Sequence, residues 1–106
     1  MNHHYVYVIL LDDVVAKKLK VKEVNPNRDP KKQCVYVGIT GLTPEERFEN
    51  HKKGYKSSKY VREYGIRLLP ELYERLNPMT YDDAVMTEEW LADKLRAEGY
   101  TVLGGH

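Results

Sequence analysis

Cysteine and long apolar runs are scarce in this sequence of 106 residues. Cys34 is the only cysteine, which excludes an internal disulfide and a zinc site made of thiolates. We expect its thiol to be buried and structural, because it lies in a strand-like run. No stretch approaches the length of a membrane helix, and the first residues lack the apolar segment of a signal peptide. The sequence therefore predicts one domain, residues 1–106, in the cytoplasm and without a membrane partner.

The motifs of several common enzyme classes are also absent. The sequence has no Ser-His-Asp order, no P-loop, no glycine-rich dinucleotide motif and no His-x₃-His pair. It has no internal repeat and no low-complexity segment. His3 and His4 are adjacent, which makes them a poor metal site by themselves. The function must therefore be inferred from other features of the sequence.

An excess of one charge is missing too, since the net charge is +1. This balance argues against a protein that coats nucleic acid through bulk electrostatics. The positive charges are nevertheless concentrated between residues 52 and 67, where Glu63 is the single acidic residue. They are Lys52, Lys53, Lys56, Lys59, Arg62 and Arg67, and Tyr55, Tyr60 and Tyr64 lie among them. Such a segment can bind a phosphate backbone, or it can be a solvated helix face with tyrosines in the core.

Two apolar runs near the start predict strands over residues 5–11 and 33–40. Residues 12–32 separate them as an insertion between strands that pair with each other. Asp12 or Asp13 can cap the segment 14–24, which fits a short helix or an extension of the strand, because its periodicity does not distinguish the two. Residues 25–30 contain two prolines and predict a loop.

Helix signals follow the second strand. Thr43, Pro44 and Glu46 form a capping box with proline at the first helical position, and Gly54 fits the end of that helix. Ser57 or Ser58 would cap a short helix over 59–64. Residues 66–69 fit a third strand, 71–76 are left unassigned, 81–98 form the longest helix, and 100–103 fit a last edge strand. This β-β-α-α-β-α order predicts an α+β domain with a small central antiparallel three-stranded sheet flanked by helices.

The predicted helix after Pro44 carries two polar residues that could take part in binding or catalysis. Arg47 and His51 are one turn apart and share a face, while Phe48 is the only large apolar residue of that helix. We therefore expect Arg47 and His51 to face something other than water, near the strand that carries Tyr36. A phenol, a guanidinium and an imidazole together suit a phosphate.

The longest predicted helix carries a further candidate. Glu88 lies three residues before Leu91 and so borders the apolar stripe, whereas Glu89 is expected at the surface. A carboxylate at the core margin is costly unless it is paired or bound to a cation such as Mg²⁺. The alternative is an ordinary surface glutamate. Likewise, Tyr7 and Tyr36 taken singly could be plain sheet aromatics.

The joint pattern resembles the GIY-YIG nuclease family. The sequences Tyr5-Val6-Tyr7 and Tyr36-Val37-Gly38 stand on the first two strands, Arg47 and His51 follow on a helix, and Glu88 lies on the last helix. The resemblance covers nearly the whole chain. Each short motif is weak alone, and their order and element types together are more specific.

The chain departs from that family in three places. The first motif reads Tyr-Val-Tyr in place of Gly-Ile-Tyr, and the insertion at residues 12–32 lengthens the gap between the motifs. Many members carry an asparagine near the end of the domain, where this chain has Gly104-Gly105-His106. Either activity is impaired by that loss, or His106 takes a related role.

The resemblance implies a metal-dependent endonuclease that hydrolyses phosphodiester bonds of nucleic acid, DNA rather than RNA. Tyr7, Tyr36, Arg47 and His51 would be catalytic, and Glu88 would bind one Mg²⁺ or Mn²⁺ ion. A tyrosine would activate the attacking water and relay its proton to His51. The residues expected to hold the nucleic-acid backbone are Lys52, Lys53, Lys56, Lys59 and Arg62. A protein partner or a homodimer could supply targeting.

Two other classes of function remain open at this point. One is a nucleic-acid-binding module with the same fold but little or no catalysis. The other is a small interaction protein whose tyrosines belong to the core. The second predicts that the Tyr7 and Tyr36 hydroxyls turn away from Arg47, without a common cleft.

Overall fold

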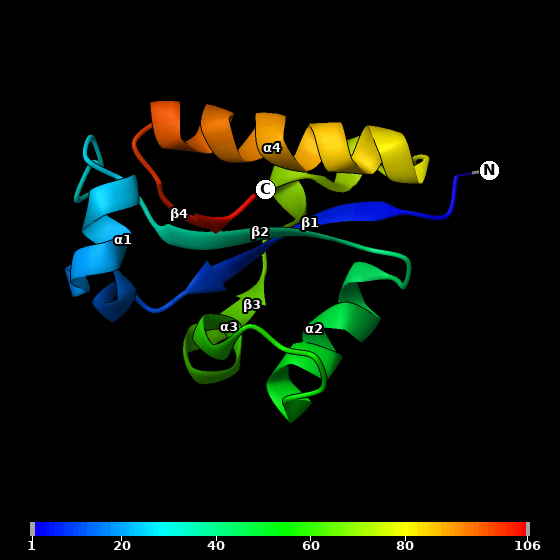
Figure 1. Cartoon of the computed structure of the whole chain (residues 1–106), viewed down its shortest axis with the longest axis horizontal. Coiled ribbons are helices and arrows are strands. Elements are labelled where there is room, and N and C mark those ends of the chain that lie inside the picture. Colours follow the sequence, from blue (N-terminus) through cyan, green and yellow to red (C-terminus); the bar gives the residue numbers. More distant parts are fainter. Residues whose placement is uncertain (1, 106) are drawn as a thin grey trace.

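The computed structural model describes residues 2–105, and Figure 1 shows the path of the chain. The strands are β1 (Tyr5–Leu11), β2 (Cys34–Thr40), β3 (Gly65–Leu68) and β4 (Thr101–Gly104). The helices are α1 (Leu19–Val24), α2 (Pro44–Lys53), α3 (Lys59–Tyr64) and α4 (Tyr81–Ala97). Short 3₁₀ turns cover Asp13–Lys17, Pro70–Leu72 and Glu74–Leu76. The last two account for most of residues 71–76, which the sequence left unassigned.

The four strands form one mixed sheet in the order β3-β1-β2-β4. Strand β1 is antiparallel to both β2 and β3, whereas β4 runs parallel to β2. The α+β class is therefore confirmed, but the predicted three-stranded antiparallel sheet was wrong in strand number and in the direction of one edge. The direction of β4 depends on which edge of the sheet the chain reaches after α4, and no local pattern in residues 100–104 encodes that.

Helices cover both faces of the sheet (Figure 1). The long helix α4 lies along one face, while α2 and α3 lie against the other. Strand β1 is buried over most of its length, as expected for a central strand. In the described part of the chain no helix is long and apolar enough to cross a membrane.

The start of α2 forms as its sequence predicts. The Thr43 hydroxyl accepts a hydrogen bond from the Glu46 amide, and the Glu46 carboxylate accepts one from the Thr43 amide. Gly54 ends the helix with a φ of 85°, a conformation that favours glycine. The capping box thus orients the helix that carries Arg47 and His51.

The insertion at residues 12–32 folds as a 3₁₀ turn and helix α1, not as an extension of the strand. Asp12 caps the turn by accepting a hydrogen bond from the Val14 amide. Asn25, predicted to lie in a loop, is buried and hydrogen-bonds to Val21 and Val102. The insertion is therefore attached to β4 as part of the fold.

Candidate active site

Strand register brings the two motif tyrosines together. Tyr7 is paired with Gly38 across β1 and β2, and because side chains alternate along a strand, Tyr36 lies on the same face as Tyr7. Their rings are 6.4 Å apart between centroids. A β-carbon at position 38 would lie 2.5 Å from the Tyr7 hydroxyl oxygen. Gly38 is therefore required because the Tyr7 ring crosses β2 at that point.

Helix α2 adds an imidazole to the two phenols. His51 is only 1% exposed, and its ring centroid lies 6.1 Å from that of Tyr7 and 5.7 Å from that of Tyr36. Its Nε2 is 2.9 Å from the Tyr7 hydroxyl oxygen. The expectation that His51 faces something other than water is confirmed.

The second ring nitrogen of His51 defines its protonation. Nδ1 accepts a hydrogen bond from the backbone amide of Ser58 at 3.2 Å, so it carries no proton. Burial, aided by the positive charge of Arg47, lowers the pKa of His51 to about 4. At neutral pH the imidazole is thus neutral with its proton on Nε2, and it donates to the Tyr7 hydroxyl.

This hydrogen-bond direction corrects one expectation from the sequence. A proton relay from a tyrosine to His51 would need a free acceptor nitrogen, and neither nitrogen is free. The Ser58 amide occupies Nδ1, and Nε2 already bears the proton directed at Tyr7. The sequence could not reveal this, because Ser58 lies in the loop after α2 and its amide reaches His51 only in the folded chain.

Both phenols are held in their protonated form in the free protein. Burial is the main cause that raises the pKa of Tyr7 and of Tyr36. The negative charge of Glu88 raises both pKa values further, and the positive charge of Arg47 opposes the rise. The two hydroxyls therefore share one electrostatic environment with Arg47 and Glu88.

Arg47 connects this group to the following loop. Its Nη1 donates to the Tyr55 carbonyl at 3.3 Å and its Nη2 to the Lys56 carbonyl at 2.7 Å. The positive charge of Arg47 also lowers the pKa of Tyr7, against the larger effect of burial. A guanidinium has five N–H donors, so Arg47 can hold the loop and still present charge to an anion.

Helix α4 contributes the carboxylate. Glu88 is 8% exposed, so the expectation that it borders the buried stripe is confirmed, and Glu89 is exposed. Residues 2–105 contain no cluster of three or more His, Cys, Asp or Glu side chains suited to a metal ion. One carboxylate provides too few ligands for zinc, whereas Mg²⁺ takes one or two carboxylates and keeps several waters.

The predicted backbone-binding residues all lie at the surface, on or beside α2 and α3; they are Lys52, Lys53, Lys56, Lys59 and Arg62. Lys52 also makes hydrogen bonds within the fold. The Lys52 ammonium donates to the Arg62 carbonyl at 3.2 Å and to the Gly65 carbonyl at 2.8 Å. Lys52 thus satisfies carbonyl groups at the end of α3, which the sequence did not indicate.

The end of the described chain runs beside the same group. Gly104 and Gly105 have φ values of 77° and 85°, and a β-carbon at position 104 would lie 2.3 Å from the Val37 carbonyl oxygen. One at position 105 would lie 2.3 Å from the Ala92 β-carbon. Only glycine fits between β2 and α4 here, a role for the pair that sequence reasoning missed. His106, proposed as a substitute for the family asparagine, lies outside the described residues.

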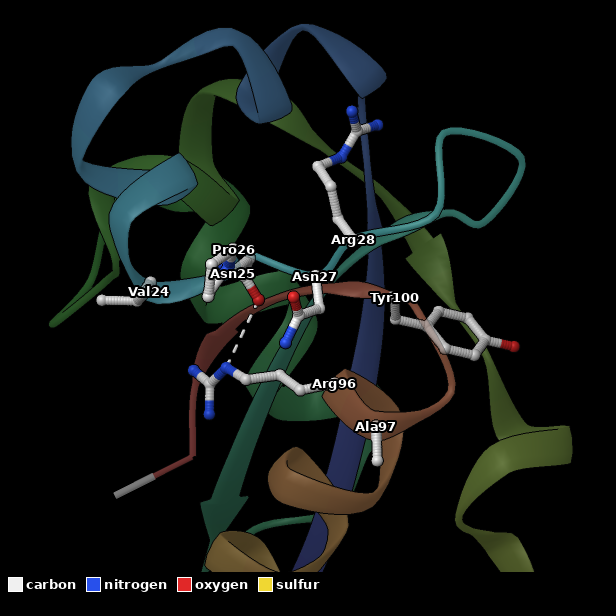
Figure 2. A pocket seen from close by; sticks show the side chains of 8 residues that line it. All are labelled: Val24, Asn25, Pro26, Asn27, Arg28, Arg96, Ala97 and Tyr100. Atoms are coloured by element: carbon white, nitrogen blue, oxygen red, sulfur yellow. Dashed lines mark hydrogen bonds between the residues drawn. The ribbon is translucent and has the colours of Figure 1, made fainter.

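A separate hollow lies near the insertion and the end of α4. It has a volume of about 240 Å³, and Figure 2 shows its lining residues. Arg96 donates to the Asn25 side-chain oxygen and to the Val102 carbonyl, and the Arg28 side chain points away from Arg96 in Figure 2. Because the two guanidinium groups do not converge, this hollow offers no second anion site.

No family model matches this chain, and no curated protein or solved structure matches it either.

Proposed function

We propose that this protein is a metal-dependent endonuclease of the GIY-YIG type, which hydrolyses phosphodiester bonds of DNA rather than RNA. The observation that supports it most is the cluster of side chains from β1, β2 and α2, on which the charge of Glu88 from α4 also acts. Tyr7, Tyr36 and His51 form a cluster of rings, and the charges of Arg47 and Glu88 act on both phenols. Such a group can bind a phosphate and orient a water beside it.

In this proposal Arg47 neutralises the non-bridging oxygens of the scissile phosphate. A guanidinium matches phosphate geometry and remains charged at any physiological pH. Because two of its donors are anchored to carbonyl groups of the following loop, its position is set before the substrate arrives. Preorganised charge of this kind stabilises a transition state without reorganisation during the reaction.

His51 acts on Tyr7 and not as a proton acceptor. Its Nε2–H donates to the Tyr7 hydroxyl oxygen, which stabilises negative charge there and leaves the phenol's own proton free to be directed at water or substrate. Tyr7 and Tyr36 then position the attacking water. Either phenolate can deprotonate that water only if its raised pKa falls, which requires positive charge from Arg47 and from a cation at Glu88.

Glu88 would hold the Mg²⁺ or Mn²⁺ ion. When bound, the ion supplies positive charge that stabilises the leaving 3′ oxygen. The Glu88 carboxylate is suited to this because it is mostly buried on α4 and its charge reaches both phenols. A cation there would offset the negative charge that now raises the pKa of Tyr36.

A nucleic-acid-binding module without catalysis is the second candidate. The raised pKa values of both phenols favour it, because a protonated phenol is not a base. The two candidates share the phosphate contact of Arg47 and differ in whether a bond is cut.

Nicking of supercoiled plasmid separates the two. We expect the native chain to nick the plasmid in Mg²⁺ or Mn²⁺ and not in EDTA. Glu88→Gln should reduce nicking to the background level, because the amide keeps the shape of the side chain but loses the charge that holds the cation.

Glu89→Gln is the matched control, since Glu89 is the exposed neighbour on the same helix. It should nick at the native rate. Plasmid retarded on a gel without being nicked would favour the binding module. Loss of nicking in Glu89→Gln and not in Glu88→Gln would contradict the assignment of Glu88.

A further inference from the structure

Three tyrosines that follow the proposed site in the sequence, together with lysines near them, form a group that we term the tyrosine track. It consists of Tyr55, Tyr60 and Tyr64 with Lys18, Lys56 and Lys59. The Lys56 ammonium lies 5.6 Å from the centre of the Tyr55 ring, and that of Lys18 lies 5.4 Å from the centre of the Tyr64 ring. Each contact is within cation–π range, so ring faces and positive charges occur together along the track.

The track starts at the proposed catalytic residues. Arg47 donates hydrogen bonds to the carbonyls of Tyr55 and Lys56, and two residues later the Ser58 amide donates to His51. The loop that presents Tyr55 is thus attached to both residues. Tyr55 is 60% exposed, and its backbone lies beside Arg47, which would hold the phosphate.

The track continues along α3 to a hollow of about 280 Å³, lined by Lys18, Lys59, Tyr60, Glu63 and Tyr64. The Tyr60 and Tyr64 rings lie 6.5 Å apart between centroids and are tilted by 34°. This volume is just below the roughly 300–1,000 Å³ range of small-ligand pockets. Lys18 belongs to the insertion at residues 12–32, so the insertion completes this hollow.

A nucleobase suits the chemistry of the hollow. The Tyr60 and Tyr64 rings are half-buried against the core, and the part of each ring that remains exposed can contact a base. The lysines offer charge for a neighbouring phosphate, and the Glu63 carboxylate can accept a hydrogen bond from a base amino group. Glu63 would repel a phosphate placed directly against it. The group therefore favours a base in the hollow and its phosphates at the rim.

Exposed aromatic rings discriminate between paired and unpaired strands. In a duplex the base faces are stacked inside, and only phosphates and base edges reach the protein. An unpaired strand presents base faces and phosphates in turn, which is the pattern that alternating tyrosines and lysines match.

We infer that the tyrosine track binds an unpaired DNA strand that leaves the active site, and that the substrate is DNA with a single-stranded segment. This inference rests on the proposed nuclease function, whose active site it extends. Stacking on Tyr55 would place the first unpaired base beside Arg47. Stacking on Tyr60 and Tyr64 would guide the strand toward Lys18.

Binding measured in EDTA tests the track without catalysis. Fluorescence anisotropy is recorded with a labelled single-stranded 20-mer and with the duplex of the same sequence. We expect Tyr55→Ala and Tyr60→Ala each to weaken single-strand binding about tenfold, within the usual range for a lost stacking ring, and to leave duplex binding nearly unchanged. Tyr60→Phe keeps the ring and should retain native affinity.

Tyr81→Ala is the matched control, because Tyr81 is 57% exposed at the start of α4, away from the track. It should bind both DNAs like the native chain. The inference is overturned if the native chain prefers the duplex, or if Tyr55→Ala and Tyr60→Ala weaken single-strand and duplex binding equally.

A spectroscopic readout reports stacking directly. Trp90 is the only tryptophan, so Trp90→Phe with Tyr55→Trp places a single indole at the start of the track. Single-stranded DNA should quench its fluorescence, and the duplex should not. An indole that no DNA quenches would contradict stacking at position 55.

Cleavage assays separate this inference from the proposed function. A duplex with a single-stranded arm and the plain duplex are compared in Mg²⁺. Tight binding of the armed DNA through the track, with no cut in either DNA, would refute the nuclease and leave the track. Equal cutting of both DNAs would refute the track and leave the nuclease.

Discussion

At the scale of single residues, His51 links the site to protein stability. The folded chain binds a proton at His51 only near pH 4, whereas the unfolded chain binds one near pH 6.5. The unfolded state is therefore favoured as the pH falls from 6.5 to 4. We expect the native chain to lose up to about 1.4 kcal/mol per pH unit across this window, relative to His51→Gln, in urea unfolding measured at several pH values.

His3→Gln is the control for this pH dependence, because it removes an exposed histidine near the start of the chain. Its free energy of unfolding should differ from that of the native chain by less than about 0.5 kcal/mol. If His51→Gln kept the native pH slope between 6.5 and 4, the neutral, hydrogen-bonded state of His51 would be wrong.

At the scale of elements, the start of α2 determines where Arg47 and His51 lie. Thr43 both caps this helix and forms the capping box with Glu46. Thr43→Ala should lower the free energy of unfolding by about 1 kcal/mol, because the Glu46 amide loses its acceptor. Urea unfolding monitored by circular dichroism measures the change.

Ser58→Ala is the matched control for this cap. Ser58 occupies the capping position of α3, but its side chain makes no capping hydrogen bond, and its amide contact with His51 does not involve the hydroxyl. The free energy of unfolding should change by less than about 0.5 kcal/mol. Equal losses in the two variants would mean that the capping box contributes nothing specific.

At the scale of the whole molecule, Asn25 joins parts of the chain that are far apart in sequence. Its side-chain amide donates to the Val21 and Val102 carbonyls, and its oxygen accepts from the Val102 amide and from Arg96. Asn25→Ala would leave several buried groups without partners, each worth about 1–3 kcal/mol. We expect the free energy of unfolding to fall by roughly 3 kcal/mol in urea titration.

Asn27→Ala provides the comparison, since Asn27 is an exposed asparagine in the same loop. It should change the free energy of unfolding by less than about 0.5 kcal/mol. A similarly small loss in Asn25→Ala would show that the insertion folds independently of β4.

Local signals explain which parts of the fold were predictable. The capping box of α2, the glycine that ends it and the border position of Glu88 depend on residues a few positions apart, so the sequence contains them in full. The sequence also predicts that Tyr7 and Tyr36 lie on the same face of the sheet, once β1 and β2 are known to pair. The two hydrogen bonds of His51 were not predictable, because both partners lie outside α2, Tyr7 on β1 and Ser58 before α3.

The sequence by itself determined the α+β class, the residue types at the candidate site and the helices that carry Arg47, His51 and Glu88. Only the tertiary structure decided the parallel edge strand β4, the protonated nitrogen of His51 and the buried role of Asn25. It also decided that Lys18 meets Tyr64. The physical reason is range: periodicity and capping act within a few residues, whereas these features arise from contacts between segments that come together only on folding.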